Sequence, residues 1–122
     1  MNIPLPKPEI INDADLYLSF QLMKRQDFAG AENRILAGLK KANKQKDTTL
    51  EGLYFSALGI LYKLKKDFKK SYKFYQQAER LLPEDNSVKI ITAILLIEEF
   101  DQFDLAIRKL ERVIENEQQD AA

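Results

Sequence analysis

The chain has 122 residues, of which 45% are hydrophobic and 31% are charged. This composition supports one compact domain and excludes a largely disordered chain. The 19 basic and 19 acidic side chains cancel, so no net charge favours nucleic acid or a membrane surface. Cysteine and histidine are absent, which excludes disulfides, thiolate nucleophiles, Cys/His metal sites and Ser-His or Cys-His catalysis.

Residues 1–11 are expected to form an extended arm, because Pro4, Pro6 and Pro8 lie there. The N-terminus lacks the basic and apolar regions of a secretory signal. The longest apolar run, from Val88 to Ile97, has about half the length needed to cross a membrane. We therefore expect a cytoplasmic protein with no membrane partner.

From residue 12 onward, apolar residues recur at helical spacing. The pattern predicts six helices, over residues 15–24, 29–44, about 50–65, 69–82, about 87–99 and 103–117. Strand patterns and hairpin-turn dipeptides are absent. The expected fold is all-α, with three antiparallel helix pairs.

Several residues are expected to mark the ends of these helices. Asn12 and Asp85 or Asn86 are candidate N-caps, and Thr48 with Glu51 matches a capping box. Pro83 is expected to end the fourth helix.

A short motif recurs three times along the chain, in which a Phe is followed three residues later by a small residue. The three pairs are Phe28/Ala31, Phe68/Ser71 and Phe103/Ala106. They are 40 and then 35 residues apart, a spacing that is typical of helical repeat arrays. Gly38 lies in mid-helix, where glycine costs about 1 kcal/mol, so it predicts a close contact between helices.

Residues 52–85 resemble the tetratricopeptide repeat, a pattern of 34 residues. The resemblance is carried by the large, small and closing positions Phe55, Leu58, Gly59, Tyr62, Ser71, Tyr75, Ala78 and Pro83. The flanking segments match less completely, since Asp15 replaces a bulky anchor and one residue is inserted near Phe100. The resemblance implies a right-handed solenoid of three repeats and a polar tail, over residues 12–47, 48–85, 86–117 and 118–122.

In this family the first helices of successive repeats line a concave groove. The residues that the resemblance places there are Tyr17, Phe20, Met23, Lys24, Leu53, Ala57, Ile60, Lys63, Leu64, Ile90, Ile94 and Ile97. A mostly apolar groove suits an apolar peptide or an amphipathic partner helix, and it lacks the polar residues that clamp a terminal carboxylate. The alternative that these residues simply form core or contacts between repeats stays open.

The resemblance extends to the small secretion chaperones of this family, which bind a short extended Pro/Val-x-Leu-x-x-Pro motif. Residues 3–8 of the arm, Ile-Pro-Leu-Pro-Lys-Pro, are a near match. One hypothesis is therefore that the arm docks in a groove of its own or of a neighbouring chain. The alternative is a leader without such a contact.

The zero net charge conceals an asymmetry along the chain. Residues 38–80 hold 11 basic and 4 acidic side chains, whereas residues 84–122 hold 4 basic and 10 acidic ones. A basic patch is expected around one predicted turn, at Lys65, Lys66, Lys69, Lys70 and Lys73. This patch is either a solvated surface, a docking site for an acidic protein or one half of a head-to-tail contact between chains. Tyr72 is the only aromatic residue among these lysines, so nucleic-acid binding is not expected.

No constellation of residues predicts catalysis, a metal or a cofactor. The four glycines form no phosphate-binding loop, and the carboxylates from Glu98 to Asp104 lack the spacing of a calcium loop. We therefore expect a non-catalytic interaction module, a monomer or weak oligomer that binds an apolar protein segment. The alternative is a structural subunit that self-associates through its charged ends.

Overall fold

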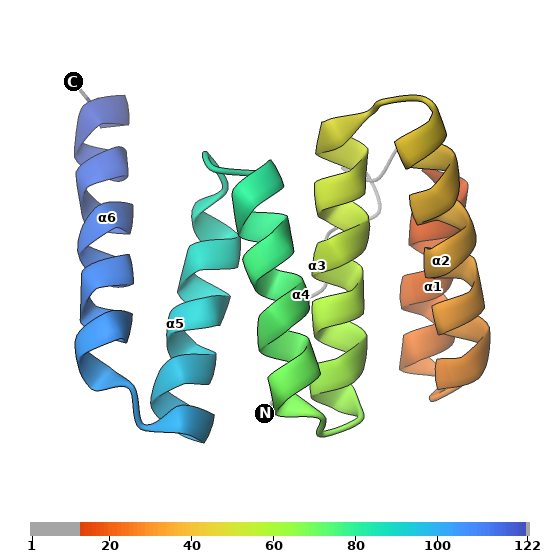
Figure 1. The fold of residues 1–122 in the computed structure, drawn as a ribbon, viewed down its shortest axis with the longest axis horizontal. Helices are drawn as coiled ribbons and strands as arrows, with labels where there is room; N and C mark the ends of the chain where they lie inside the picture. Colours follow the sequence, from red (N-terminus) through yellow and green to blue (C-terminus); the bar gives the residue numbers. More distant parts are fainter. Residues whose placement is uncertain (1–12, 122) are drawn as a thin grey trace.

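The computed structural model describes residues 13–121, with side chains as far as residue 118. This part of the chain is all-α, as expected, with six helices and no strand (Figure 1). The helices are α1 (Ala14–Lys24), α2 (Phe28–Lys44), α3 (Thr48–Leu64), α4 (Phe68–Leu81), α5 (Asn86–Phe100) and α6 (Phe103–Ala121). The predicted arm and the predicted cap Asn12 lie outside the described residues.

The helices follow one another across the molecule in chain order, from α1 and α2 at one end to α6 at the other (Figure 1). Each helix contacts the next one in the chain, and α1 also contacts α3. In the view of Figure 1, α1 lies behind α2. The last helix runs to Ala121 and so includes residues 118–121, which were expected in a polar tail.

The same turn follows each of the first three helices. The second residue after each of these helices has a positive φ: Gln26 at 64°, Lys46 at 58° and Lys66 at 63°. The next residue is an aspartate, Asp27, Asp47 or Asp67, whose side chain accepts the backbone N–H three residues later. These carboxylates satisfy backbone donors that a helix N-terminus leaves unpaired.

Asp47 therefore caps α3, and the capping box predicted from Thr48 and Glu51 is wrong. Thr48 is the first helical residue, and the Glu51 carboxylate accepts a hydrogen bond from the Asn43 side chain, 3.2 Å away. The cap predicted at Asp85 is confirmed, since its carboxylate accepts the backbone N–H groups of Ser87 and Val88.

The turn between α5 and α6 is different. Asp101 has a φ of 54° and directly follows α5, and the Gln102 N–H donates to the Leu96 carbonyl at 3.0 Å. The buried residues Ala93 and Ala106 meet across this turn in one small apolar cluster. This geometry accommodates the one-residue insertion that the sequence indicated near Phe100.

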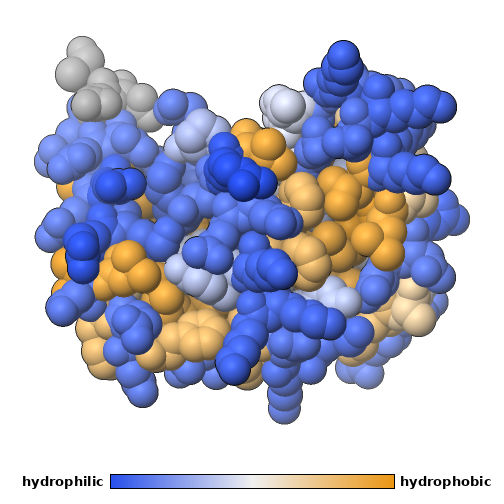
Figure 2. Space-filling view, viewed as in Figure 1, coloured by the Kyte–Doolittle hydropathy of each residue, from blue (hydrophilic) through white to orange (hydrophobic). Residues whose placement is uncertain are grey.

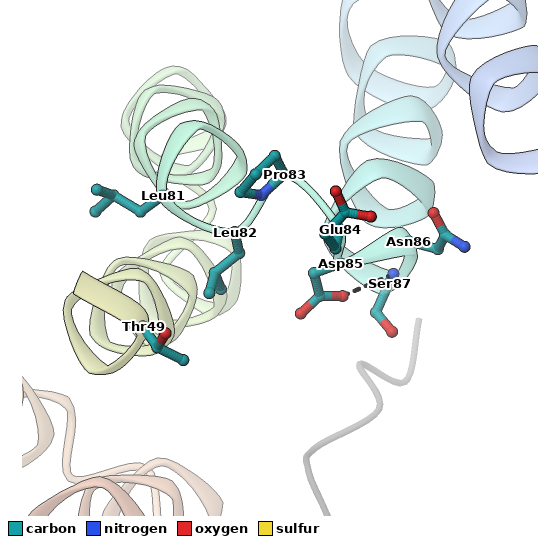
Figure 3. Close-up of a pocket in the computed structure, with 8 residues that line it drawn as sticks. All are labelled: Thr49, Leu81, Leu82, Pro83, Glu84, Asp85, Asn86 and Ser87. Atoms are coloured by element: carbon teal, nitrogen blue, oxygen red, sulfur yellow. Dashed lines mark hydrogen bonds between the residues drawn. The ribbon is translucent and has the colours of Figure 1, made fainter. Parts of the chain in front are cut away.

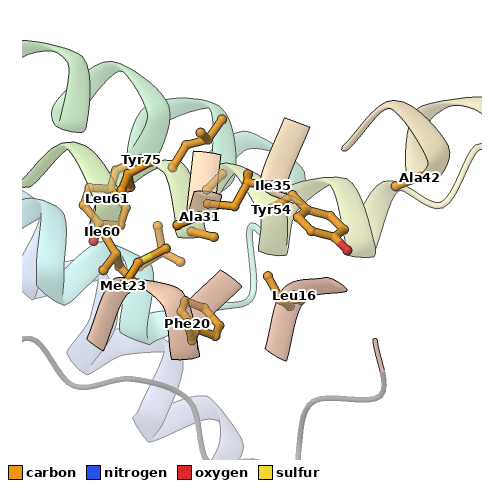
Figure 4. Close-up of a cluster of buried hydrophobic side chains, with 14 of the residues drawn as sticks. Leu16, Phe20, Met23, Ala31, Ile35, Ala42, Tyr54, Ile60, Leu61 and Tyr75 are labelled. Atoms are coloured by element: carbon orange, nitrogen blue, oxygen red, sulfur yellow. The ribbon is translucent and has the colours of Figure 1, made fainter. Parts of the chain in front are cut away.

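Two glycines allow tyrosine rings to enter the core. A Cβ on Gly38 would lie 2.1 Å from the ring of Tyr54, and one on Gly59 would lie 2.8 Å from the ring of Tyr75. The close contact predicted at Gly38 is therefore confirmed. Tyr54, rather than its neighbour Phe55, is the fully buried aromatic residue of α3 (Figure 4).

Candidate functional site

Four of the residues expected in the groove belong to the hydrophobic core. Phe20 and Met23 of α1 pack in the same buried cluster as Ala57 and Ile60 of α3. Figure 4 shows Met23 beside Ile60 between these two helices. These side chains join α1 to α3 and leave little surface for a partner.

Other residues of the predicted groove remain accessible. Leu53 and Leu64 of α3 and Ile90 and Ile97 of α5 each expose 36–37% of their surface, and Ile94 is half-buried. We refer to these five apolar residues of α3 and α5 as the candidate surface. On α1, Lys24 is exposed and Tyr17 is half-buried.

A buried lysine lies next to the candidate surface. Lys63 of α3 has only 9% of its surface exposed, and the ion pairs among the described residues do not include it. Burial lowers the pKa of Lys63, and the negative charges of Glu98 and Glu99 on α5 partly offset this effect. Lys63 and these two carboxylates each lie in the last turn of their helix.

The five lysines of the predicted basic patch are all exposed and lie in the turn after α3 and in α4. Their aromatic neighbour is not Tyr72, which packs against Phe100 with ring centroids 5.8 Å apart. It is Tyr62, whose ring lies 4.8 Å from the Lys65 nitrogen and 5.2 Å from that of Lys70. Such contacts hold the cations against the protein surface.

Tyr62 is also tied to α2. Its hydroxyl donates to the Glu32 carboxylate at 3.0 Å, and Lys65 lies 3.8 Å from the same carboxylate. Burial and the hydrogen bond to Glu32 raise the pKa of Tyr62. This half-buried network joins the basic patch to the preceding helix pair.

Sequence reasoning missed the exposed apolar residues of α6. Phe103, Ile107 and Ile114 are more exposed than any residue of the candidate surface. Their spacing of four and seven residues was the available signal, because such residues share one side of a helix.

Two hollows beside α5 do not assemble reactive groups. A hollow of about 540 Å³ lies where Leu81, the last residue of α4, and Leu82 lead into the loop before α5 (Figure 3). Its most enclosed carboxylate, Asp85, already caps α5. A second hollow of about 310 Å³ is mostly apolar and is lined by Tyr72, Leu96, Phe100, Gln102 and Leu105.

Figure 2 shows a hydrophilic band over α4, with apolar surface over α2 and α3 on one side and over the lower part of α5 and α6 on the other. No helix among the described residues is long and apolar enough to cross a membrane. In the same part of the chain, no group of three acidic side chains is placed to hold a metal ion.

No family model, no curated protein and no solved structure matches the chain.

Proposed function

We propose that the protein is a non-catalytic interaction module that holds a short apolar peptide or helix of another protein against the candidate surface. In this proposal the six helices form three antiparallel pairs, stacked as a right-handed solenoid of tetratricopeptide type. The observation that carries the proposal is the exposure of Leu53, Leu64, Ile90 and Ile97 on two helices beside a fully packed core.

The packing of α3 and α4 supports the repeat architecture. Gly59 admits the Tyr75 ring, and the Ser71 hydroxyl donates to the Gly59 carbonyl at 2.7 Å. Two small residues and one large residue of the repeat pattern thus meet at one point between the paired helices. A glycine also admits a tyrosine ring between α2 and α3, at Gly38 and Tyr54, although Tyr54 is not a position of the repeat pattern.

The chemistry of the candidate surface favours an apolar ligand. Its five residues are Leu or Ile, and burying such side chains stabilises a complex by about 25 cal/mol per Å² of apolar surface. The nearby cation, Lys63, is buried and is influenced by two carboxylates. It therefore offers little to a ligand carboxylate.

A peptide library displayed on phage tests the proposal. Peptides selected by the wild-type protein should contain two or more large apolar residues at a fixed spacing. A selected peptide, made synthetically, should lose at least about tenfold in affinity for the Leu64→Ser/Ile97→Ser variant, measured by calorimetry. Both side chains are exposed, so the variant should fold, which circular dichroism would check.

Leu36→Ser is the matched control, because Leu36 is 47% exposed but lies on α2. This variant should bind the peptide as the wild type does. Equal affinity of the wild type and the Leu64→Ser/Ile97→Ser variant for every selected peptide would refute the proposed site.

A further inference from the structure

α6 carries a row of large apolar side chains that no other described element covers. Phe103, Ile107 and Ile114 have 53%, 51% and 54% of their surface exposed. Because residues four and seven apart share one side of a helix, the three form a single row, which we call the α6 face. A contiguous apolar row of this kind is typical of an interaction site, whereas isolated exposed apolar residues are not.

The α6 face lies on the side of α6 that is turned away from α4. Leu105 lines a hollow together with Tyr72 of α4, and Lys109 binds Glu79 of α4 at 2.8 Å. Leu105 and Lys109 therefore mark the side of α6 that faces α4. By helical spacing, the α6 face lies across the buried Ala106 from them.

The internal repeat shows what covers the equivalent positions elsewhere in the molecule. The small buried residues that serve as reference points are Ala31 in α2, Ser71 in α4 and Ala106 in α6. One position later stand Glu32, Tyr72 and Ile107. Glu32 accepts a hydrogen bond from Tyr62 of α3, and Tyr72 packs against Phe100 of α5.

The residues eight positions after the reference residues Ala31 and Ser71 are also in contact with other parts of the molecule. Leu39 of α2 packs against the main core, and Glu79 of α4 binds Lys109 of α6. Three of these four positions on α2 and α4 thus contact a helix that follows in the chain, and the fourth, Leu39, packs against the core. On α6 both positions are isoleucine and half exposed, so the occupant that matches the repeat geometry is another helix.

Carboxylates border the α6 face. Asp104, Glu111 and Glu115 are exposed and follow its outer edge, away from α5. The exposed Arg108 and Arg112 lie further round the helix, and Lys109 is already paired with Glu79. A helix placed on the α6 face would therefore meet mainly negative charge beside the apolar row.

We propose that the α6 face binds an amphipathic helix of a partner protein, one that carries lysine or arginine beside its apolar residues. Its apolar side packs on Phe103, Ile107 and Ile114, and its cations pair with the bordering carboxylates. A second copy of this chain fits this surface less well, since a second α6 would bring two rows of carboxylates together. The inference is independent of the proposed function, because the candidate surface uses α3 and α5.

Two synthetic peptides of about 14 residues, roughly four helical turns, test the proposal. One contains leucine at helical spacing with lysine elsewhere, and the other has glutamate in place of every lysine. The lysine peptide should bind the wild-type protein, more weakly as the salt concentration rises, and the glutamate peptide should not bind. Fluorescence anisotropy of labelled peptides measures both.

Two variants locate the site. Ile107→Ser/Ile114→Ser should weaken binding of the lysine peptide at least about tenfold, and Asp104→Asn/Glu111→Gln/Glu115→Gln should weaken it and reduce its salt dependence. Leu36→Ser is the control, because Leu36 is exposed but lies on α2, and it should bind as the wild type does. Leu53→Ser/Leu64→Ser shows whether the peptide occupies the candidate surface instead.

Three outcomes would overturn the inference. The first is equal binding of the two peptides, and the second is loss of binding in the Leu53→Ser/Leu64→Ser variant alone, which would place the peptide on the candidate surface. The third is a wild-type dimer in analytical ultracentrifugation that Ile107→Ser/Ile114→Ser dissociates, since a second copy would then be the occupant. None of these outcomes decides the phage-selection test of the candidate surface.

Discussion

The first four helices and the last two pack in different ways. Within α1–α4, tyrosine rings enter spaces that glycines leave open, and the main core cluster draws most of its members from these helices. Between α5 and α6 the buried contact is made by Ala93, Leu96 and Ala106, and no aromatic residue there is fully buried among the described side chains. Large apolar residues of α6 are exposed instead.

The large side chains of the repeated helices therefore have two different roles in the two regions. Large side chains that point inward between α1 and α4 hold neighbouring helices in fixed positions. In α6 three large side chains point outward, and the internal contact is made by Ala93, Leu96 and Ala106 with Leu110 packed against them. We infer that α1–α4 supply most of the stability, whereas α6 supplies accessible apolar surface.

The largest expected effect is that of a methyl group between α2 and α3. Gly38→Ala should lower the free energy of unfolding by about 3 kcal/mol, because the added Cβ would lie 2.1 Å from the buried Tyr54 ring. Urea denaturation measures the change. At the equivalent position of α6 stands Val113, and Val113→Ala should cost about 2 kcal/mol, because it removes two buried methyl groups and causes no clash.

A double-mutant cycle isolates the contact at Gly38. In a Tyr54→Leu background the ring is absent, so Gly38→Ala should cost less than about 0.5 kcal/mol. An undiminished loss in that background would show that the methyl group clashes elsewhere, and the comparison between the two regions would lose its main support.

A smaller effect is expected in native-state hydrogen exchange. Backbone amides of α6 should exchange through an opening that costs about 2 kcal/mol less than the opening of α3, because fewer buried side chains hold α6 in place. Exchange followed by NMR in low concentrations of denaturant would resolve the two openings. Equal protection of α3 and α6 would mean that the six helices unfold as one unit.

The smallest effects concern the two buried tyrosines, and they should have opposite signs. The Tyr54 hydroxyl donates to Asp13, so Tyr54→Phe should destabilise the protein by about 1 kcal/mol. The Tyr75 hydroxyl is buried without a hydrogen-bond partner among the described residues, so Tyr75→Phe should stabilise it by about 1 kcal/mol. Thermal and urea unfolding of both variants would test the pair, and two changes of equal sign would contradict it.

These tyrosines also make stability depend on alkaline pH. Burial raises the pKa of Tyr54 and of Tyr75 above their ordinary value of about 10. The unfolded chain therefore loses these protons first, and stability falls as the pH rises above about 10. As the pH rises from 8 to 11, roughly one unit above that pKa, each Phe variant should become more stable relative to the wild type.

The sequence predicted the helices well because their signals are local. Apolar spacing located all six, and Gly38 indicated a close contact without naming its partner. The capping box failed because Asp47, one residue earlier, competes with Thr48 for the same backbone donors. Choosing between two adjacent caps depends on where the preceding turn ends, which apolar spacing does not define.

The candidate site was less predictable, since burial depends on which helices meet. Phe20 and Ile60 have the same apolar character as Leu64 and Ile97, yet the first two lie in the core and the last two are exposed. Helical spacing assigns a residue to one side of a helix, but it does not say which neighbour covers that side. The three residues of the α6 face were overlooked for the same reason.

The three identical turns have a consequence for engineering. Asp27, Asp47 and Asp67 are 20 residues apart, and each closes the same backbone geometry. Phenylalanine follows both Asp27 and Asp67, so a duplicated segment from Phe28 to Asp67 would rejoin the chain at native junctions. Two helices can thus be added to the molecule while an aspartate followed by a phenylalanine stands at both junctions.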